Sequence, residues 1–191
     1  LFLSLVGSRF ELHQAVSKEE VRSLTDAELP IYTILLPVYK EDNLIKKLIW
    51  NLQSLDYPRE RLDVKLLIEE DDDLTLNAVR GLDFPAVFEV IVVPFHMPQT
   101  KPKACNYGLH FSRGKYLTIY DAEDIPDTDQ LKKVVSMFGK LPSNYICIQS
   151  ALNYYNRNEN FLTRMFTLEY SYWFDYMLPG LDTLDIPIPL G

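Results

Sequence analysis

Ile31–Leu36 reads IYTILL, and Pro37 follows it directly. A short apolar run that ends at a proline is typical of a buried strand. The next segment, Asp42–Leu55, carries apolar residues at the spacing of one helix face and ends before Pro58. A buried strand followed at once by an amphipathic helix indicates an α/β protein.

The same alternation continues along the chain. Further strands are expected at Val64–Ile68, Val87–Val93, Tyr116–Tyr120 and Tyr145–Gln149. Helices are expected at Leu74–Arg80, Lys103–Phe111, Asp129–Phe138 and Phe161–Leu178. Apolar strands that alternate with helices favour a parallel sheet covered on both faces. In such sheets ligands bind beyond the carboxyl ends of the strands, so the residues that follow each strand carry the chemistry.

Composition excludes several classes of protein. The chain has 191 residues, of which 47% are apolar and 24% are charged, so it suits a globular domain. Its net charge of −8 argues against a nucleic-acid partner, because phosphates attract basic surfaces. Cys105 and Cys147 are too few for a disulfide framework and fit a reducing compartment. No apolar run reaches the roughly 18 residues that cross a bilayer.

The first part of the chain differs from the rest. Residues 1–29 are polar and mixed in charge, and we expect them to form a linker or accessory segment before a domain at residues 30–191. Leu1–Val6 fits either the end of a membrane helix that begins earlier or a helix that packs on the domain. Because the first residue is Leu rather than Met, we expect the chain to be part of a longer protein.

The sharpest chemical signal is Tyr120–Asp124, which reads YDAED after an expected strand. In an extended segment Asp121 and Glu123 would point to the same side. Two carboxylates on one side suit Mg²⁺ or Mn²⁺, which bind a couple of carboxylates together with substrate phosphates. A D-x-E pair alone is common in turns, but its place directly after an apolar strand favours a metal site.

The other strand ends also carry polar groups. Tyr39 offers a flat face for a base, and Asn43 offers either a ligand contact or a helix cap. Glu69–Asp73 is a run of five acidic residues that must be solvated, meet cations or bind donor groups of a ligand. Lys101 and Lys103 begin a helix, where backbone N–H groups also favour anions. Together these groups indicate an ionic ligand at the strand ends.

Four motifs taken together resemble the family 2 glycosyltransferases of the GT-A fold, in particular their cellulose-synthase-like, membrane-bound branch. The motifs are Leu36–Tyr39, Leu67–Asp72, Lys101–Gly108 and Tyr120–Asp124. The resemblance runs from about residue 30 to residue 191. It implies a mostly parallel, Rossmann-like α/β sheet with helices on both faces, which forms the donor-binding part of the enzyme and is truncated before the acceptor-binding half.

The resemblance also implies roles for individual residues. Tyr39 would pack on the nucleoside base, Lys103 would touch the diphosphate, and Gln149 would line the acceptor side. Glu70 stands where the family usually has a nucleoside-binding aspartate, so an acceptor group is retained. The full set of substrate-binding residues implied in this way is Pro37, Tyr39, Glu41, Glu70, Asp72, Lys103, Asn106, Asp121 and Gln149.

The implied reaction is a hexosyltransferase-type, inverting transfer of a sugar from a nucleotide-sugar, usually a UDP-sugar, to a glycan or lipid acceptor. Asp121 and Glu123 would match the family's D-x-D site for Mg²⁺ or Mn²⁺, and the longer glutamate arm should still coordinate. The cation would neutralise charge on the departing diphosphate. The enzyme would act at the cytoplasmic face of the cell membrane, which it would contact through parts outside this chain.

A catalytic base is missing from the motifs. In the family a T-E-D-like motif supplies the group that accepts the acceptor's proton, and a Q-x-x-R-W motif follows it; neither occurs here. We therefore expect the general base to lie beyond Gly191. The 191-residue chain alone is expected to bind nucleotide with metal but to transfer sugar poorly or not at all.

Two other functions compete with this one. A nucleotidyltransferase on a similar sheet usually has a Gly- and Arg-rich phosphate loop after the first strand, whereas residues 37–43 contain no glycine. A non-catalytic module could use its acidic strand ends to bind cations, nucleotides or a basic partner. Nucleotide binding that strengthens with Mn²⁺ would favour the glycosyltransferase over the non-catalytic module.

Overall fold

A computed structural model describes residues 2–9, 16–82 and 84–188 of the chain. It divides the chain into two compact units. The sheet unit is Val16–Lys140, and the helical unit combines Leu1–Ala15 with Leu141–Gly191. The two units are described separately below.

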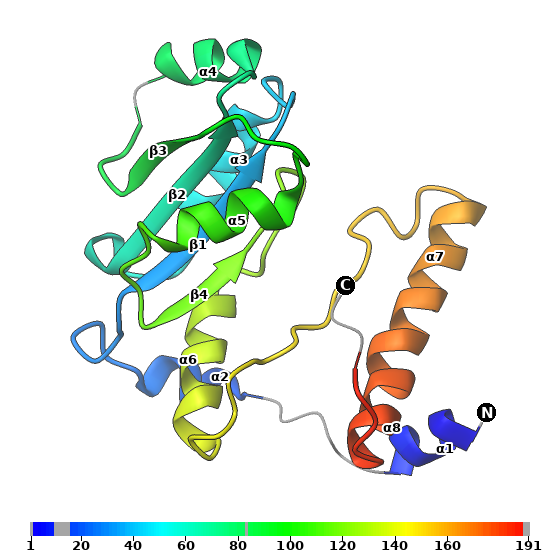
Figure 1. The fold of residues 1–191 in the computed structure, drawn as a ribbon. Coiled ribbons are helices and arrows are strands. Elements are labelled where there is room, and N and C mark those ends of the chain that lie inside the picture. The colour runs from blue at the N-terminus through cyan, green and yellow to red at the C-terminus, as the bar shows by residue number, and fades with distance from the viewer. Residues whose placement is uncertain (1, 10–15, 83, 189–191) are drawn as a thin grey trace. The chain divides into compact units, whose positions relative to one another are not determined.

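The centre of the sheet unit is a sheet of four parallel strands in the order β3-β2-β1-β4 (Figure 1). Its strands are β1 (Tyr32–Val38), β2 (Leu62–Glu69), β3 (Phe88–Val93) and β4 (Tyr116–Ile119). Every residue of β2 is buried, as expected for a strand covered on both faces. These four strands confirm four of the five strand predictions.

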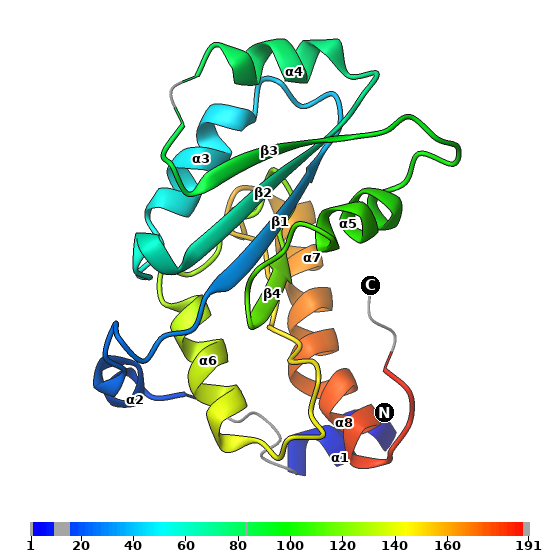
Figure 2. The ribbon, with the colours of Figure 1, turned by 60° about the vertical axis from the view of Figure 1, so that its left-hand side comes forward.

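Helices cover both faces of this sheet, as the sequence predicts. Side chains alternate along β1, so that Ile34 and Leu36 enter one apolar cluster while Leu35 enters another. The first cluster includes residues of α3 (Ile45–Gln53), α4 (Asp73–Arg80) and α6 (Gln130–Lys140), and the second includes residues of α5 (Lys101–Leu109). Figure 2 shows α5 and α3 on opposite faces. The sheet unit also contains α2 (Lys18–Ser23) and the short 3₁₀ turn η1 (Arg59–Arg61).

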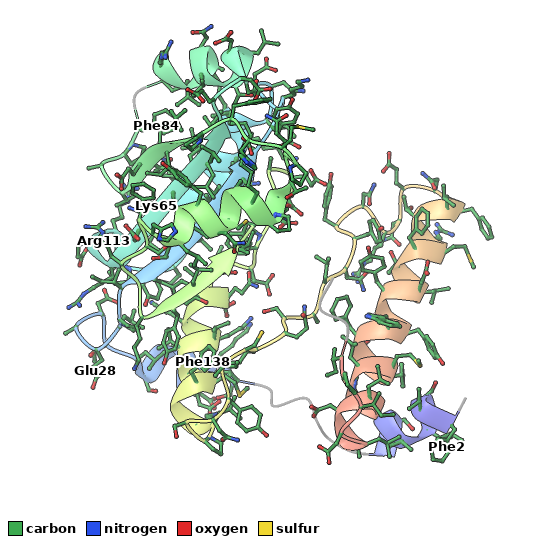
Figure 3. All side chains as sticks on the ribbon, in the orientation of Figure 1. Phe2, Glu28, Lys65, Phe84, Arg113 and Phe138 are labelled. Carbon is green, nitrogen blue, oxygen red and sulfur yellow. The ribbon has the colours of Figure 1, made fainter. Side chains whose placement is uncertain are left out.

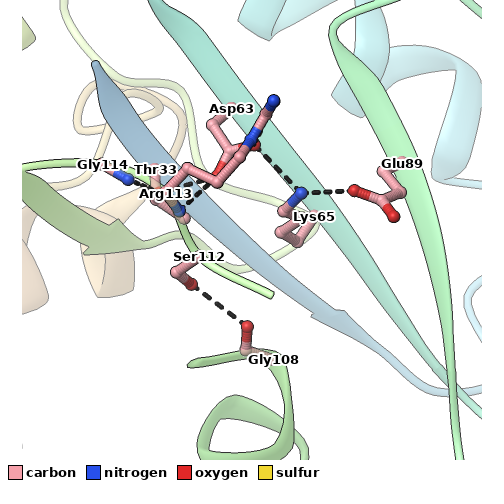
Figure 4. Close-up of polar contacts among 8 residues, drawn as sticks. All are labelled: Thr33, Asp63, Lys65, Glu89, Gly108, Ser112, Arg113 and Gly114. Atoms are coloured by element: carbon pink, nitrogen blue, oxygen red, sulfur yellow. Dashed lines mark hydrogen bonds and ion pairs between the residues drawn. The ribbon is translucent and has the colours of Figure 1, made fainter. Parts of the chain in front are cut away.

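On the face of the sheet that α5 covers, a polar network takes the place of apolar residues near the amino ends of the strands. Asp63 and Lys65 of β2 are 1% and 2% exposed, and their charged groups lie 3.0 Å apart. Asp63 also accepts a 2.8 Å hydrogen bond from Thr33 and pairs with Arg113, while Lys65 pairs with Glu89 (Figure 4). Figure 3 labels Lys65 and Arg113 among the side chains of the sheet unit. The network therefore joins three neighbouring strands to the loop that precedes β4.

The predicted fifth strand at Tyr145–Gln149 is wrong. These residues are irregular in the structure, and the side chain of Ile146 is 91% exposed. Apolar alternation records which side chains favour burial, but a strand also needs a neighbour for its backbone hydrogen bonds. No neighbour pairs with this segment among the described residues.

The helical unit contains α1 (Phe2–Arg9), α7 (Phe161–Tyr172), the π-helical segment η2 (Trp173–Met177) and α8 (Leu178–Thr183). Helix α1 packs closely on η2 and α8. At Gly7 the helices are so close that a β-carbon would lie only 2.1 Å from the Tyr176 carbonyl oxygen. Tyr154 packs on α7, with its ring centroid 4.9 Å from that of Tyr170. None of the helices in the described part of the chain is long and apolar enough to cross a membrane.

Candidate binding site at the carboxyl ends of the strands

The strand order creates a switch point at the carboxyl ends of β1 and β4. From β1 the chain proceeds outward to β2 and β3, and it then returns to the other side of β1 to form β4. The connections after β1 and β4 therefore diverge, and such a position is where open parallel sheets bind ligands. The residues at this point are Tyr39–Glu41 after β1 and Tyr120–Asp124 after β4.

The acidic segment after β4 is a closed turn. The Asp124 N–H donates to the Asp121 carbonyl over 3.1 Å, and the Asp121 N–H donates to the Asp124 carboxylate over 2.8 Å. The amide of Asn51, on α3, donates to the Asp124 carbonyl over 3.2 Å. The extended conformation expected for Asp121 and Glu123 is therefore wrong, because Asp124 draws the backbone into a turn.

Three carboxylates and one ammonium act on one another at the switch point. Burial raises the pKa of Glu41, and the negative charges of Glu123 and Asp121 raise this pKa further. The positive charge of Lys101 acts on Glu41 in the opposite direction. The Lys101 ammonium forms an ion pair with the Asp121 carboxylate. The electrostatic interactions thus link Glu41 from the loop after β1, the acid pair from the turn after β4 and a lysine from α5.

These groups suit a divalent cation by their chemistry. Carboxylate oxygens are hard donors of the kind that Mg²⁺ and Mn²⁺ prefer. Over the described residues, no group of three or more His, Cys, Asp or Glu side chains is arranged to hold a metal ion by itself. Mg²⁺ commonly takes one or two protein carboxylates and completes its shell with substrate phosphates and water. The acid pair of the turn therefore fits a cation that binds together with a phosphorylated ligand.

The loop after β1 has an unusual backbone. Lys40 has a φ of 57°, a conformation that is uncommon for residues other than glycine. The Lys40 N–H donates to the Asp72 carboxylate over 2.5 Å, which stabilises this conformation. The Lys40 ammonium lies 4.8 Å from the centre of the Tyr39 ring, and that ring is 40% exposed. Part of Tyr39 is therefore exposed, and its role as a stacking surface for a base stays a prediction.

Asp72 has a structural role in this arrangement. One oxygen accepts the Lys40 N–H, and the other caps α4 by accepting the Thr75 N–H over 3.2 Å. Burial would raise the pKa of Asp72, but these hydrogen bonds outweigh burial and the pKa is lowered. The side chain is only 3% exposed. Asp72 thus fixes the Tyr39 loop through its hydrogen bond to Lys40. Its role as a direct ligand contact stays a prediction.

Three other acids of the Glu69–Asp73 run, Glu69, Glu70 and Asp71, are also engaged. Glu69 is 5% exposed and accepts the Lys103 ammonium over 2.8 Å. Glu70 accepts the backbone N–H of Phe95 over 3.0 Å, and Asp71 accepts the side-chain amide of Gln99 over 2.7 Å. These contacts connect the loop after β2 to the loop after β3. The partners in these contacts are groups of the chain itself, so the binding of ligand donor groups by this acidic run stays a prediction.

The residues predicted to bind substrate occupy different places. Pro37 pairs with Leu67 within the sheet and is half-buried, and Asn106 is exposed on α5. Gln149 belongs to the helical unit, where its amide donates to the Ser150 carbonyl over 3.1 Å. The predicted residues that follow the four strands of the sheet unit lie beyond the carboxyl ends of those strands, and their roles in ligand binding stay predictions. These residues are Tyr39, Glu41, Glu70, Asp72, Lys103, Asp121 and Glu123.

The sequence indicates both Lys101 and Lys103 as anion-favouring groups, but the family resemblance gives the diphosphate contact to Lys103 alone. In the structure Lys103 is held by Glu69 and by the Pro94 carbonyl, whereas Lys101 pairs with Asp121 beside the acidic turn. The signal for Lys101 is its position at the first turn of α5, which the motif shares with Lys103. Asp124 was missed, although its spacing from Asp121 is that of a turn.

An open parallel sheet with these groups at its switch point defines an α/β protein that binds its ligand at the carboxyl edge. The profile described as Glycosyl transferase family 2 matches residues 33–189, which contain all the strand ends described above. The chain belongs to glycosyl transferase family 2.

Two curated relatives have low sequence identity to this chain and are about three times as long. Beta-monoglucosyldiacylglycerol synthase of Trichormus variabilis is 26% identical over 158 residues, which are 80% of this chain and 33% of that protein. The dolichyl N-acetyl-alpha-D-glucosaminyl phosphate 3-beta-D-2,3-diacetamido-2,3-dideoxy-beta-D-glucuronosyltransferase of Methanococcus voltae is 25% identical over 109 residues, or 57% of this chain and 34% of that protein. The chain thus spans about a third of the length of these relatives.

A solved structure has a similar fold. The mannosyltransferase PcManGT from Pyrobaculum calidifontis, in complex with GDP-Man and Mn²⁺, superposes with a TM-score of 0.55 at 24% sequence identity. The superposition covers 72% of this chain and 39% of that one. It confirms the predicted α/β, GT-A-like fold.

Proposed function

We propose that the chain is the donor-binding part of a glycosyltransferase that moves a sugar from a nucleotide-sugar to a glycan or lipid acceptor. The donor that we expect is a UDP-sugar, and we expect inversion at the sugar carbon. Membership of glycosyl transferase family 2 supports the reaction class. The expected nucleotide and stereochemistry come from the motifs that resemble the cellulose-synthase-like branch.

One observation carries the proposal. The acidic turn Asp121–Asp124 directly follows β4 at the switch point, where it faces the charges of Glu41 and Lys101. A nucleotide-sugar has a flat base, a ribose and a diphosphate, and these parts call for a stacking surface, acceptor groups and positive charge. Tyr39 provides an exposed ring near this turn, and α5 provides lysines and a helix amino end.

The residues of this chain would divide the work of holding the donor. Tyr39 would stack on the base, while Asp72 fixes the loop that carries Tyr39. Asp121 and Glu123 would hold Mg²⁺ or Mn²⁺, which when bound would offset the charge of the departing diphosphate. Lys103, held by Glu69 in the structure, would lie beside that diphosphate. Precise placement of the donor in this way is itself a source of rate enhancement.

The nature of the acceptor is a further part of the proposal. The names of the two relatives refer to a glucosylated diacylglycerol and to a dolichyl phosphate, which supports a lipid or lipid-linked acceptor. Such an acceptor would bring the whole protein to a membrane, and we propose the cytoplasmic face, where nucleotide-sugars would be available. No T-E-D-like motif occurs in these 191 residues, so we propose that the chain alone binds donor and transfers sugar poorly.

Calorimetric titration of the chain with UDP, with and without Mn²⁺, tests the proposal. We expect Mn²⁺ to strengthen UDP binding, and we expect Asp121→Asn and Glu123→Gln to lose this effect. In each variant the affinity for Mn²⁺ should fall by at least the roughly 10- to 100-fold that is typical of removing an outer-shell partner of a metal ligand. Asp26→Asn is the matched control, because Asp26 is exposed and precedes β1 at the opposite end of the strands.

The results separate the competing functions. An affinity for UDP that does not change with Mn²⁺, or an effect of Mn²⁺ that both substitutions leave unchanged, would contradict the proposed metal and diphosphate site. Metal binding that is indifferent to nucleotide would favour a non-catalytic cation-binding module. A parallel titration with GDP distinguishes the nucleotide, since a flat ring such as Tyr39 accepts any base.

A further inference from the structure

We propose that Lys101 is a built-in counter-ion, which holds the Asp121 carboxylate until a divalent cation displaces it. Metal binding and release of Lys101 would then be one coupled exchange. The proposal rests on the proposed function, because it takes Asp121 as a metal ligand. Lys101 is a positioning residue in this scheme, since it would act through Asp121.

The geometry of the ion pair supports an exchange. The Lys101 ammonium contacts the Oδ1 atom of Asp121, and the two side chains are 47% and 48% exposed. An ion pair that is half exposed has little net stability and exchanges readily with solvent. A lone pair that accepts the ammonium is not free for a metal ion, and two cations on one carboxylate repel each other. A metal ion that binds through Oδ1 of Asp121 therefore requires Lys101 to move, and one that binds the other carboxylate oxygen is repelled by the Lys101 ammonium.

The second lysine of the same helix turn provides a contrast. Lys103 is held at 2.8 Å by both the Glu69 carboxylate and the Pro94 carbonyl, and its side chain is 22% exposed. Glu69 is almost completely buried, so this ion pair is fixed in place. Of the two lysines, Lys103 is thus anchored while Lys101 rests on an exposed acid beside the proposed metal site. The two side chains are suited to different roles.

The exchange has a consequence for the donor. Lys101 is the first residue of α5, where unpaired backbone N–H groups and the helix dipole favour anions. Once a metal ion has displaced it, the Lys101 ammonium is free to approach the diphosphate from this helix end. Metal and nucleotide would then bind cooperatively, because the cation that leaves Asp121 becomes available to the phosphate groups. In the absence of metal, Lys101 offsets part of the negative charge of the acidic turn.

Titration of the chain with Mn²⁺ alone, followed by electron paramagnetic resonance of the free ion, tests the exchange. We expect Lys101→Met to bind Mn²⁺ about two- to fivefold more tightly than the unaltered chain, the range that corresponds to losing one exposed ion pair. Lys101→Arg keeps the cation and should bind Mn²⁺ like the unaltered chain. Lys140→Met is the matched control, because Lys140 forms a comparably exposed ion pair with Glu20 away from the strand ends.

Adding UDP gives a second measurement. In the unaltered chain UDP should increase the affinity for Mn²⁺ by a larger factor than in Lys101→Met, because the variant has no ammonium to transfer. Mn²⁺ affinity that is equal or weaker in Lys101→Met overturns the exchange, provided that the unaltered chain binds Mn²⁺ through Asp121. If Asp121→Asn leaves Mn²⁺ binding unchanged, the proposed function fails, and the exchange fails with it.

Discussion

Arg113 donates two hydrogen bonds to a single carboxylate oxygen of Asp63, from Nε at 2.9 Å and from Nη2 at 2.8 Å. Asp63 is 1% exposed and also neutralises Lys65, which is 2% exposed (Figure 4). The carboxylate therefore balances a lysine that has almost no access to water. This arrangement lies on the sheet at the amino ends of the strands, opposite the proposed binding edge.

Asp63→Ala should lower the free energy of unfolding by about 3 kcal/mol or more, because it leaves the buried Lys65 ammonium without its buried partner. Urea denaturation followed by circular dichroism measures this loss. Glu89→Ala is the control, since Glu89 is 55% exposed and Lys65 retains Asp63 when it is removed. A loss for Glu89→Ala as large as that for Asp63→Ala would contradict the assignment.

The same carboxylate should make stability depend on pH. Burial would raise the pKa of Asp63, but its contacts with Lys65 and Arg113 outweigh burial and lower the pKa. A carboxyl whose pKa is lower in the folded state contributes stability above its ordinary value of about 3.9, and that stability is lost as the pH falls below it. We expect the free energy of unfolding to decrease between pH 5 and pH 3 in acid titrations, and to decrease less in Asp63→Asn.

The variant still contains Asp72, whose pKa is also lowered, so some acid dependence should remain in Asp63→Asn. In the double variant Asp63→Asn with Asp72→Asn, the free energy of unfolding should depend even less on pH in the acid range. Identical acid profiles for the unaltered chain and Asp63→Asn would show that the Asp63 contacts do not persist in solution.

Gly114→Ala should destabilise the fold because the loop before β4 has no room for a methyl group. A β-carbon at Gly114 would lie 2.4 Å from the Thr33 backbone nitrogen and 2.6 Å from the Tyr116 carbonyl oxygen. Both atoms belong to strand backbones, which cannot shift without disturbing the sheet. Thermal unfolding should show a clear decrease in the melting temperature.

Gly139→Ala is the matched control for this prediction. A β-carbon there meets no atom within 4 Å, and the residue lies within α6. Alanine favours helix over glycine by about 1 kcal/mol, so this variant should be neutral or slightly more stable. Equal melting temperatures for the two variants would contradict the packing around Gly114.

The sequence predicts most of the sheet unit and its binding edge for a simple reason. Apolar runs such as Ile31–Leu36 and Val64–Ile68 report burial on both faces, and burial on both faces is the property of an inner parallel strand. The helix between them has a periodic face that is equally local information. Strand ends follow from these elements, so the positions of Tyr39 and Asp121 at one edge were also predictable.

Other features depend on partners that are distant in sequence. Lys40 adopts a positive φ because Asp72, 32 residues later, accepts its N–H. Lys101 pairs with Asp121, which lies 20 residues later in the chain. No local sequence pattern distinguishes Lys101 from Lys103. The prediction of a fifth strand is wrong for the same reason, since the apolar pattern of residues 145–149 does not specify a neighbouring strand. Side-chain pairing between loops, unlike burial, is not recorded in periodicity.

Tyr39→Ala should weaken UDP binding by roughly tenfold or more, because stacking of one base on an aromatic ring contributes about 1–3 kcal/mol. Lys40 approaches the ring to 4.8 Å from its centre, and the exposed part of the ring is the surface that we propose for the base. Tyr39→Phe keeps the ring and should retain most of the affinity in a calorimetric titration. Equal weakening in both variants would point to the hydroxyl group and against stacking.

Asp124→Ala should weaken Mn²⁺-dependent UDP binding although Asp124 is not a proposed metal ligand. Its carboxylate accepts the Asp121 N–H over 2.8 Å and so closes the turn that positions Asp121 and Glu123. Losing this hydrogen bond should also cost about 1 kcal/mol of stability. Asp124→Asn retains an oxygen acceptor at the same place and should restore most of the metal dependence. A metal ligand would behave differently, because asparagine in place of a coordinating carboxylate removes the charge that binds the cation. Full loss of metal dependence in Asp124→Asn would therefore show that Asp124 binds the metal ion directly and does not act only by closing the turn.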